Sequence, residues 1–418
     1  MLPETHGEVC RLGYLKLIPL MREPDGRGGI SLKKTGENLL EFIKNLEPTN
    51  KKCPGILSGR SSLKTAIYYV VLARDLKLLG EELPLLYACK SIQYLESAIN
   101  GGANNVSHES IIKLSKGERL IFTYVLARRD PLFPGIAEWA SKQESFKRRD
   151  AILQIMEEVL PHAISNMISK HNGDDAELRL KTILDRIRKY GQQLKEELVK
   201  NPVGWIKTRY YGAGRHLIAP RIEWMVDLHL LSRSSGKRRV KRYAPTAALK
   251  MTARAICAIS ATEDCDEMIA SLDQIAKSIA PAGLAPHQDE IRRAIARTYR
   301  IMAKIVDPVP ELALILSSCA RLMDCEYKVT PTLVRKELQK MTLLGQVNFK
   351  ASQESGLLIT WISDDPNDDD TQVSSLFLGL TKSLSMPIAI RHKEAICRSK
   401  PNKKPKPLAR APKSSSKK

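Results

Sequence analysis

The stretch that decides the fold reads PRIEWMVDLHLLSRSSGKRRVKRY and runs from Pro220 to Tyr243. Its first part is predicted to be a helix that begins at Pro220, because proline has no N–H to lose at the first helical position. Apolar residues then recur at three- and four-residue spacing, which places them on one face of the helix; they are Ile222, Met225, Val226 and Leu228. The other face carries Arg221, Glu223, Trp224 and Asp227.

The second part is predicted to be a β-hairpin. Leu231–Arg233 and Val240–Tyr243 are short segments with a Ser-Gly turn signal between them. The hairpin region contains no acid and six basic residues, which are Arg233, Lys237, Arg238, Arg239, Lys241 and Arg242. Each of these side chains can neutralise a phosphate, so the pattern predicts nucleic-acid binding that weakens steeply as salt rises. An ordinary solvated surface is the alternative interpretation.

A helix followed directly by a short basic hairpin resembles the third helix and wing of a winged helix-turn-helix domain. In that family the helix enters the major groove of DNA and the wing rests on the phosphates. The resemblance implies a winged helix over 171–262, with its first helix at Ala176–Lys200, its second at Val203–Tyr211 and a turn at Gly212–Gly214. Arg221 is then expected to read guanine, and Trp224 to contact a thymine methyl group or stack on a sugar. Core packing is an equally good interpretation of Trp224.

A second helix-plus-wing pattern is predicted within 263–362. Thr330 is a good N-cap and Pro331 a good first residue for a helix that runs to about Leu344. Residues 345–350 and 357–361 alternate like two strands. The residues of this unit that are predicted to contact DNA are Arg335, Lys336, Lys340 and Lys350. For the helix residues among them, a basic surface without a ligand is an equally good interpretation.

The remaining chain is expected to support these units. Residues 1–50 are predicted to form a partial winged-helix-like unit, with strands at Leu15–Met21 and Ile30–Leu32 and a helix at Thr35–Leu46. Residues 51–170 have the pattern of a helical bundle, and 363–390 that of an acidic linker with a short helix. The predicted fold class is therefore mainly α, with two or three winged helix-turn-helix units on a helical scaffold and a disordered basic C-terminal tail over 391–418.

The charge of the chain favours a polyanionic partner. The formal net charge is +21, and the tail is rich in lysine, arginine, proline and serine. Such an excess is typical of nucleic-acid-binding proteins. Lys403, Lys404 and Lys406 in the tail are expected to add affinity that does not depend on DNA sequence. In a eukaryotic protein the same lysines would fit a nuclear import signal.

Motifs for catalysis, metals or membranes are lacking in the sequence. It contains no phosphate-binding loop, no GxSxG motif and no HExxH motif. Its eight cysteines form no CxxC pair, and no apolar run reaches the ~18 residues of a spanning helix. We therefore expect a protein without enzymatic activity, metal or cofactor. Scattered thiols suit a reducing compartment, so we expect a cytoplasmic, nucleoid-associated protein.

The sequence thus predicts a sequence-preferring, double-stranded DNA-binding protein that acts in replication initiation or transcription regulation. Tandem winged helices with a basic tail resemble archaeal origin-binding winged-helix initiators and large transcription regulators. The alternative is a non-catalytic subunit of a restriction or anti-phage complex, in which winged helices bind protein as well as DNA.

Overall fold

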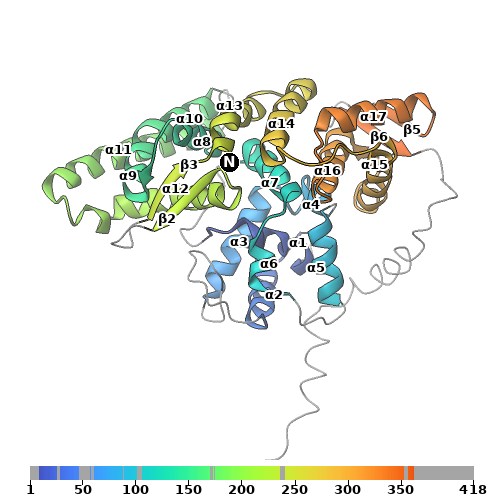
Figure 1. Cartoon of the computed structure of the whole chain (residues 1–418). Helices are drawn as coiled ribbons and strands as arrows, with labels where there is room; N and C mark the ends of the chain where they lie inside the picture. Colours follow the sequence, from blue (N-terminus) through green and yellow to red (C-terminus); the bar gives the residue numbers. More distant parts are fainter. Residues whose placement is uncertain are drawn as a thin grey trace, which may run out of the picture. The chain divides into compact units, whose positions relative to one another are not determined.

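Helices make up most of the structure, as the sequence predicts (Figure 1). The computed structural model describes residues 9–25, 29–46, 57, 61–87, 89–100, 106–169, 173, 175–235, 241–352 and 356–361. All of these residues belong to one compact unit. Two small antiparallel sheets accompany the helices in this part of the chain.

The first described residues enter the core. A 3-10 helix, η1 (Leu12–Lys16), is followed by α1 (Ile18–Met21), and nearly every residue from Val9 to Met21 is buried. The predicted strand at Leu15–Met21 is therefore wrong. The backbone forms helical hydrogen bonds instead, such as the one from the Met21 N–H to the Leu17 carbonyl oxygen at 3.0 Å. The helix predicted after it is confirmed as α2 (Leu32–Lys44), which is capped by the side chain of Ser31.

The region predicted to be a helical bundle is helical, with one exception. Its helices are α3 (Leu63–Asp75), α4 (Leu83–Tyr87), α5 (Lys90–Asn100), α6 (His108–Ile112), α7 (Lys116–Arg129), α8 (Phe133–Ser141), α9 (Arg148–Gln154) and α10 (Leu160–Ile168). A π-helical turn at Ile155–Val159 joins the last two. The exception is a two-residue strand, β1 (Phe146–Lys147), which the sequence analysis does not predict.

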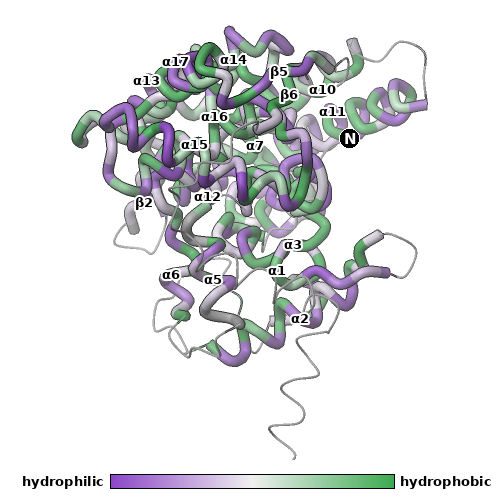
Figure 2. The backbone as a smooth tube through the Cα atoms, turned by 90° about the vertical axis from the view of Figure 1, so that its right-hand side faces the viewer, coloured by the Kyte–Doolittle hydropathy of each residue, from purple (hydrophilic) through white to green (hydrophobic). Residues whose placement is uncertain are grey.

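Two long helices follow, and their boundaries correct one part of the prediction. Hydrophobic and hydrophilic residues alternate along α11 (Asp175–Lys200; Figure 2). After a short 3-10 turn at Trp205–Lys207, α12 runs without a break from Arg209 to Asp227. The predicted turn at Gly212–Gly214 therefore lies inside a helix, and so does Pro220. Gly214 is explained by packing instead of a turn, because a Cβ atom there would lie 2.1 Å from the sulfur of Met156.

The predicted hairpin after α12 is confirmed within the described residues. β2 (Leu231–Ser235) pairs antiparallel with β3 (Lys241–Pro245), and β1 joins the free edge of β3, so that the strand order is β1-β3-β2. Phe146 of β1 lies opposite Tyr243 of β3, and the two rings stack with centroids 5.6 Å apart. The region predicted as a separate bundle thus supplies one strand of this sheet.

The last part of the described chain has a similar sheet. Its elements are α13 (Ala247–Ala261), α14 (Cys265–Ile279), α15 (Gln288–Met302), β4 (Val309–Pro310), α16 (Glu311–Met323), α17 (Pro331–Leu343), β5 (Val347–Ser352) and β6 (Gly356–Trp361). The strand order is β4-β6-β5. The helix start predicted from Thr330 and Pro331 is confirmed, since the Thr330 hydroxyl accepts a hydrogen bond from the Leu333 N–H. The two strands of the predicted second hairpin are confirmed as well.

None of the helices in the described ranges combines the length and the apolar character needed to span a bilayer.

Candidate nucleic-acid interface

Arg221 is not available to read a base. Its side chain is completely buried and forms two hydrogen-bonded contacts with Asp130, Nε to Oδ2 at 2.7 Å and Nη2 to Oδ1 at 3.0 Å. Its third nitrogen, Nη1, donates to the carbonyl oxygen of Leu217 on the same helix. The prediction that Arg221 contacts guanine is therefore wrong, because the α7–α8 connection covers the helix face from which it projects.

Trp224 is also a core residue. Its side chain is fully buried, and its indole Nε1 donates to the carbonyl oxygen of Val9 at 2.9 Å. Burial of a tryptophan is favourable when its N–H finds such a partner. Of the two interpretations of Trp224, core packing is the one that the structure bears out, and DNA contact is excluded by burial.

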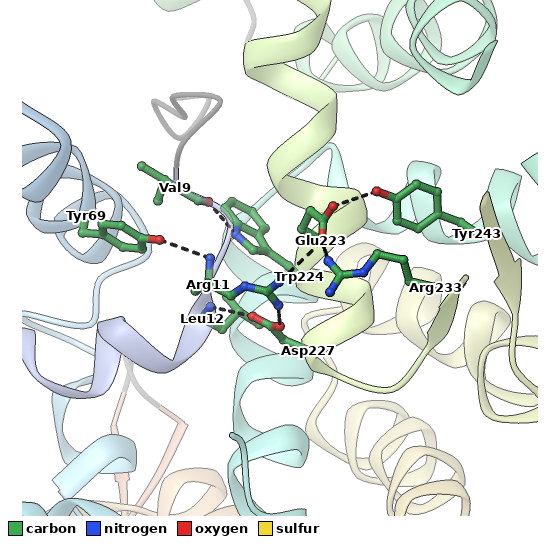
Figure 3. Close-up of polar contacts among 9 residues, drawn as sticks. All are labelled: Val9, Arg11, Leu12, Tyr69, Glu223, Trp224, Asp227, Arg233 and Tyr243. Carbon is green, nitrogen blue, oxygen red and sulfur yellow. Dashed lines mark hydrogen bonds and ion pairs between the residues drawn. The ribbon is translucent and has the colours of Figure 1, made fainter. Parts of the chain in front are cut away.

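The two carboxylates on the same side of α12 hold the N-terminal segment and the hairpin (Figure 3). Asp227 accepts a hydrogen bond from the backbone N–H of Leu12 at 3.0 Å and pairs with the Arg11 guanidinium. Glu223 accepts the hydroxyl of Tyr243 at 2.7 Å and Nη1 of Arg233 at 2.6 Å. Arg11 also approaches Glu223 at 3.8 Å. The side of α12 predicted to face DNA is thus an internal, ion-paired junction.

Burial raises the pKa values of two groups in this junction, Asp227 and Tyr243. Loss of solvent raises the pKa of Asp227 to about 6, although Arg11 and the Leu12 N–H oppose the rise. Burial also raises the pKa of Tyr243, and the charge of Glu223 adds to the effect. Both groups remain hydrogen-bonded, so the junction joins three segments far apart in sequence without an unpaired carboxylate.

A different surface of the hairpin carries exposed positive charge. In the β1-β3 pairing, Lys147 lies directly opposite Arg242. Arg242 is exposed and Lys147 half-buried, whereas their neighbours Phe146 and Tyr243 alternate onto the buried face. Like charges on directly opposed residues destabilise a sheet. Two cations held together on a solvated face therefore form a local site that an anion would stabilise.

Other basic residues surround this pair. Arg148, the first residue of α9, lies close enough to Tyr243 to lower the pKa of its hydroxyl, in opposition to the larger effect of burial. The pKa of Lys241 is lowered, mainly by burial, against the raising effect of the charge on Glu223. Side chains alternate along a strand, so Lys241 lies on the Tyr243 side of β3, opposite to Arg242. We call Lys147 and Arg242 the basic sheet surface.

The structure separates the residues predicted for the first wing. Arg242 belongs to the basic sheet surface, whereas Lys241 lies on the other face of β3, on the side of Tyr243. Arg233 is committed to Glu223, with its side chain 20% exposed. Lys237, Arg238 and Arg239 lie outside the described residues. Lys147 and Arg148 could not be predicted, because nothing in the local pattern shows that residues 146–147 add a strand to a hairpin almost a hundred residues later.

In the second unit, Arg335 differs from its neighbours. It is half-buried, with Nε 3.1 Å from Glu311, and it also pairs with Asp266. Two carboxylates neutralise it, so its predicted role in DNA contact is not supported. Lys336 and Lys350 are exposed, and Lys340 is exposed beside Glu337 at 3.2 Å. Lys403, Lys404 and Lys406 lie outside the described residues.

Within the described ranges, His, Cys, Asp and Glu side chains form no group that could hold a metal ion. Comparison of the chain with protein-family models, curated proteins and solved structures gave no match.

Proposed function

We propose that this protein binds double-stranded DNA without catalysing a reaction, and that it acts in replication initiation or transcription regulation. The observation that carries the proposal is the pairing of Lys147 with Arg242 on the solvated face of the first sheet. Two adjacent cations can each contact a phosphate of a duplex, where they release counterions and gain affinity. The net charge of +21 agrees with such a partner.

The order of elements supports two winged helix-turn-helix units. In the second unit, α15, β4, α16, α17, β5 and β6 follow one another, and the short strand β4 joins the edge of the hairpin. This helix–strand–helix–helix–hairpin order resembles the winged-helix pattern. The first unit resembles it with an insertion, since β1 precedes α9 and α10, and the long α11 comes before α12 and the hairpin.

The two units are proposed to have different roles. Arg221 and Trp224 are buried, so α12 cannot read bases, and the first unit contacts the phosphates through its basic sheet surface. Contacts to phosphates position a protein on DNA but carry no direct sequence information. Sequence preference is therefore assigned to α17, whose outer face exposes Lys336, Gln339 and Lys340.

The test is duplex binding measured by fluorescence anisotropy over a range of salt concentrations. Wild type is compared with Lys147→Gln/Arg242→Gln and with a matched control, Lys34→Gln/Lys44→Gln, which removes two exposed lysines of α2. Loss of two phosphate contacts is expected to flatten the slope of log affinity against log salt by roughly two. The control should follow wild type. Equal binding by all three proteins, or no binding by wild type at low salt, would contradict the proposal.

The alternative function, a subunit of a restriction or anti-phage complex, is favoured by one observation. Leu343 and Leu344 at the end of α17 are 88% and 60% exposed, next to the second hairpin. Adjacent exposed leucines are typical of a protein contact. If this function is correct, an ATPase or nuclease co-purifies with wild type but not with Leu343→Gln/Leu344→Gln, while DNA affinity is unchanged. Co-purification that survives the double substitution would count against this alternative.

A further inference from the structure

A second exposed cationic surface contains aromatic rings, and it lies where α11 meets the start of α12. The rings of Tyr190 on α11 and Tyr210 on α12 have centroids 5.4 Å apart. The guanidinium of Arg209 lies 4.9 Å from the centre of the Tyr210 ring, and its Nη2 donates to the Tyr210 hydroxyl at 3.2 Å. Both tyrosines are half-buried and Arg209 is exposed. We call these three residues the tyrosine–arginine stack.

The charge around the stack is positive. The side chains that share a helix face with a residue lie three or four positions away from it. Around Tyr190 these positions hold Arg186, Ile187, Gln193 and Leu194, and after Tyr210 on α12 they hold Ala213 and Gly214. Ile206 and Lys207 precede Tyr210 in the 3-10 turn that leads into α12. None of them is acidic, and Arg186 and Lys207 are exposed. Among the described residues, Arg209 itself is within ion-pair distance of no carboxylate. The surface is therefore suited to an anionic ligand that also has a flat apolar face.

Single-stranded nucleic acid has both properties. Its unpaired bases stack on aromatic side chains and arginine planes, while lysine and arginine nearby follow the phosphates. The bases of a duplex are already stacked on one another, so their faces cannot reach a protein ring. The combination of rings and cations thus distinguishes this surface from the basic sheet surface, which consists of a lysine and an arginine.

We propose that the tyrosine–arginine stack binds an unpaired base of single-stranded DNA, with Arg186 and Lys207 on the neighbouring phosphates. The nature of the polymer rests on the proposed function. The two surfaces are close in the structure. Tyr211, next to Tyr210, is near enough to Arg148, the residue after Lys147, for the charge of Arg148 to lower the pKa of the Tyr211 hydroxyl, against the larger rise caused by burial. A DNA molecule in which a duplex continues into a single strand is thus the ligand that would contact both surfaces.

The test uses a short single-stranded oligonucleotide with one 2-aminopurine, whose fluorescence falls when the base stacks. Tyr210→Ala is expected to lose the quenching and about 10-fold in affinity, within the range for one stacked base. Tyr210→Phe keeps the ring and should retain the quenching. Tyr94→Ala removes a tyrosine of α5 that is 57% exposed and serves as the matched control. Quenching that persists in Tyr210→Ala would overturn the proposal.

Arg209→Ala separates binding from folding, because the side chain is exposed and its loss removes no core packing. It is expected to weaken single-strand binding several-fold with an unchanged melting temperature, and unchanged single-strand affinity would overturn the proposal. Blunt duplex is measured with the same proteins. The proposed function fails if wild type does not bind blunt duplex, whereas the present inference fails if wild type does not bind the single strand, whatever the duplex result.

Discussion

Arg221 on α12 and Asp130 at the end of α7 form a bidentate ion pair in which neither side chain is exposed to solvent. A guanidinium and a carboxylate match one another in geometry, so the pair satisfies both charges inside the protein. This relationship makes α12 a scaffold of the fold rather than a reader of DNA. It also leaves the proposed duplex contact near the C-terminal half of α12 to the basic sheet surface.

Arg221→Ala is expected to destabilise the protein by about 3–5 kcal/mol, because it leaves Asp130 buried without its partner. The measurement is urea unfolding. As a control, Lys142→Ala removes one partner of an exposed pair with Glu138 and should cost less than about 1 kcal/mol. If Arg221 instead contacted DNA, its loss would reduce duplex affinity in protein that is still fully folded.

Lys147→Glu is expected to raise stability while it weakens DNA binding. The substitution places an acid opposite Arg242 and turns a repulsive cross-strand pair into an attractive one. The free energy of unfolding should rise by roughly 0.2–1 kcal/mol. The same change removes one phosphate contact and adds a repulsion. Thermal unfolding and duplex anisotropy together test the prediction, and a fall in stability would show that the two side chains do not oppose each other.

We expect the titration of Asp227 to make the protein more stable in acid than at neutral pH. Its pKa is about 6 in the folded protein, above the ~4 of an aspartate in the unfolded chain, so the folded state binds more protons between these values. The contribution of this group to stability is then complete below pH ~4 and is lost as the pH rises through ~6, by about 3 kcal/mol in total. Asp227→Asn cannot titrate. From pH 4 to pH 7, the free energy of unfolding of wild type should fall relative to that of Asp227→Asn. A constant difference between the two proteins would refute the raised pKa of Asp227.

Tyr243→Phe is expected to cost about 1.5–3 kcal/mol, because Glu223 loses a buried hydrogen bond to its carboxylate. The stacking of the ring on Phe146 is kept, so the loss reports the hydroxyl alone. Tyr94→Phe, at an exposed position, should be neutral. Urea unfolding that shows no difference between Tyr243→Phe and wild type would mean that Glu223 is satisfied without the tyrosine.

Several elements could be predicted from the sequence because local chemistry determines them. Thr330 and Pro331 mark the start of α17, and the alternating residues after it form β5 and β6. The Ser-Gly signal correctly indicated that Leu231 and Tyr243 lie in paired strands. Each of these features depends on residues within a few positions of one another, so a short window contains all the information.

The candidate site could be predicted only in part, because its burial depends on distant segments. Glu223 and Asp227, one turn apart on α12, were the available signal that this side faces protein, since carboxylates repel DNA phosphates. The partners that bury them, Arg11 and Leu12, lie more than two hundred residues earlier. In the same way, β1 becomes a strand only because β3 offers it an unpaired edge.

The sequence by itself determined the helical class of the described chain, the two hairpins and the positions of the basic residues, because periodicity, capping and charge are local properties. The tertiary structure decided which of those charges are neutralised inside the protein and which face solvent. The physical reason is that a charged side chain enters the core only with a partner, and the partners of Arg221 and Asp227 come from segments that the fold alone brings to α12.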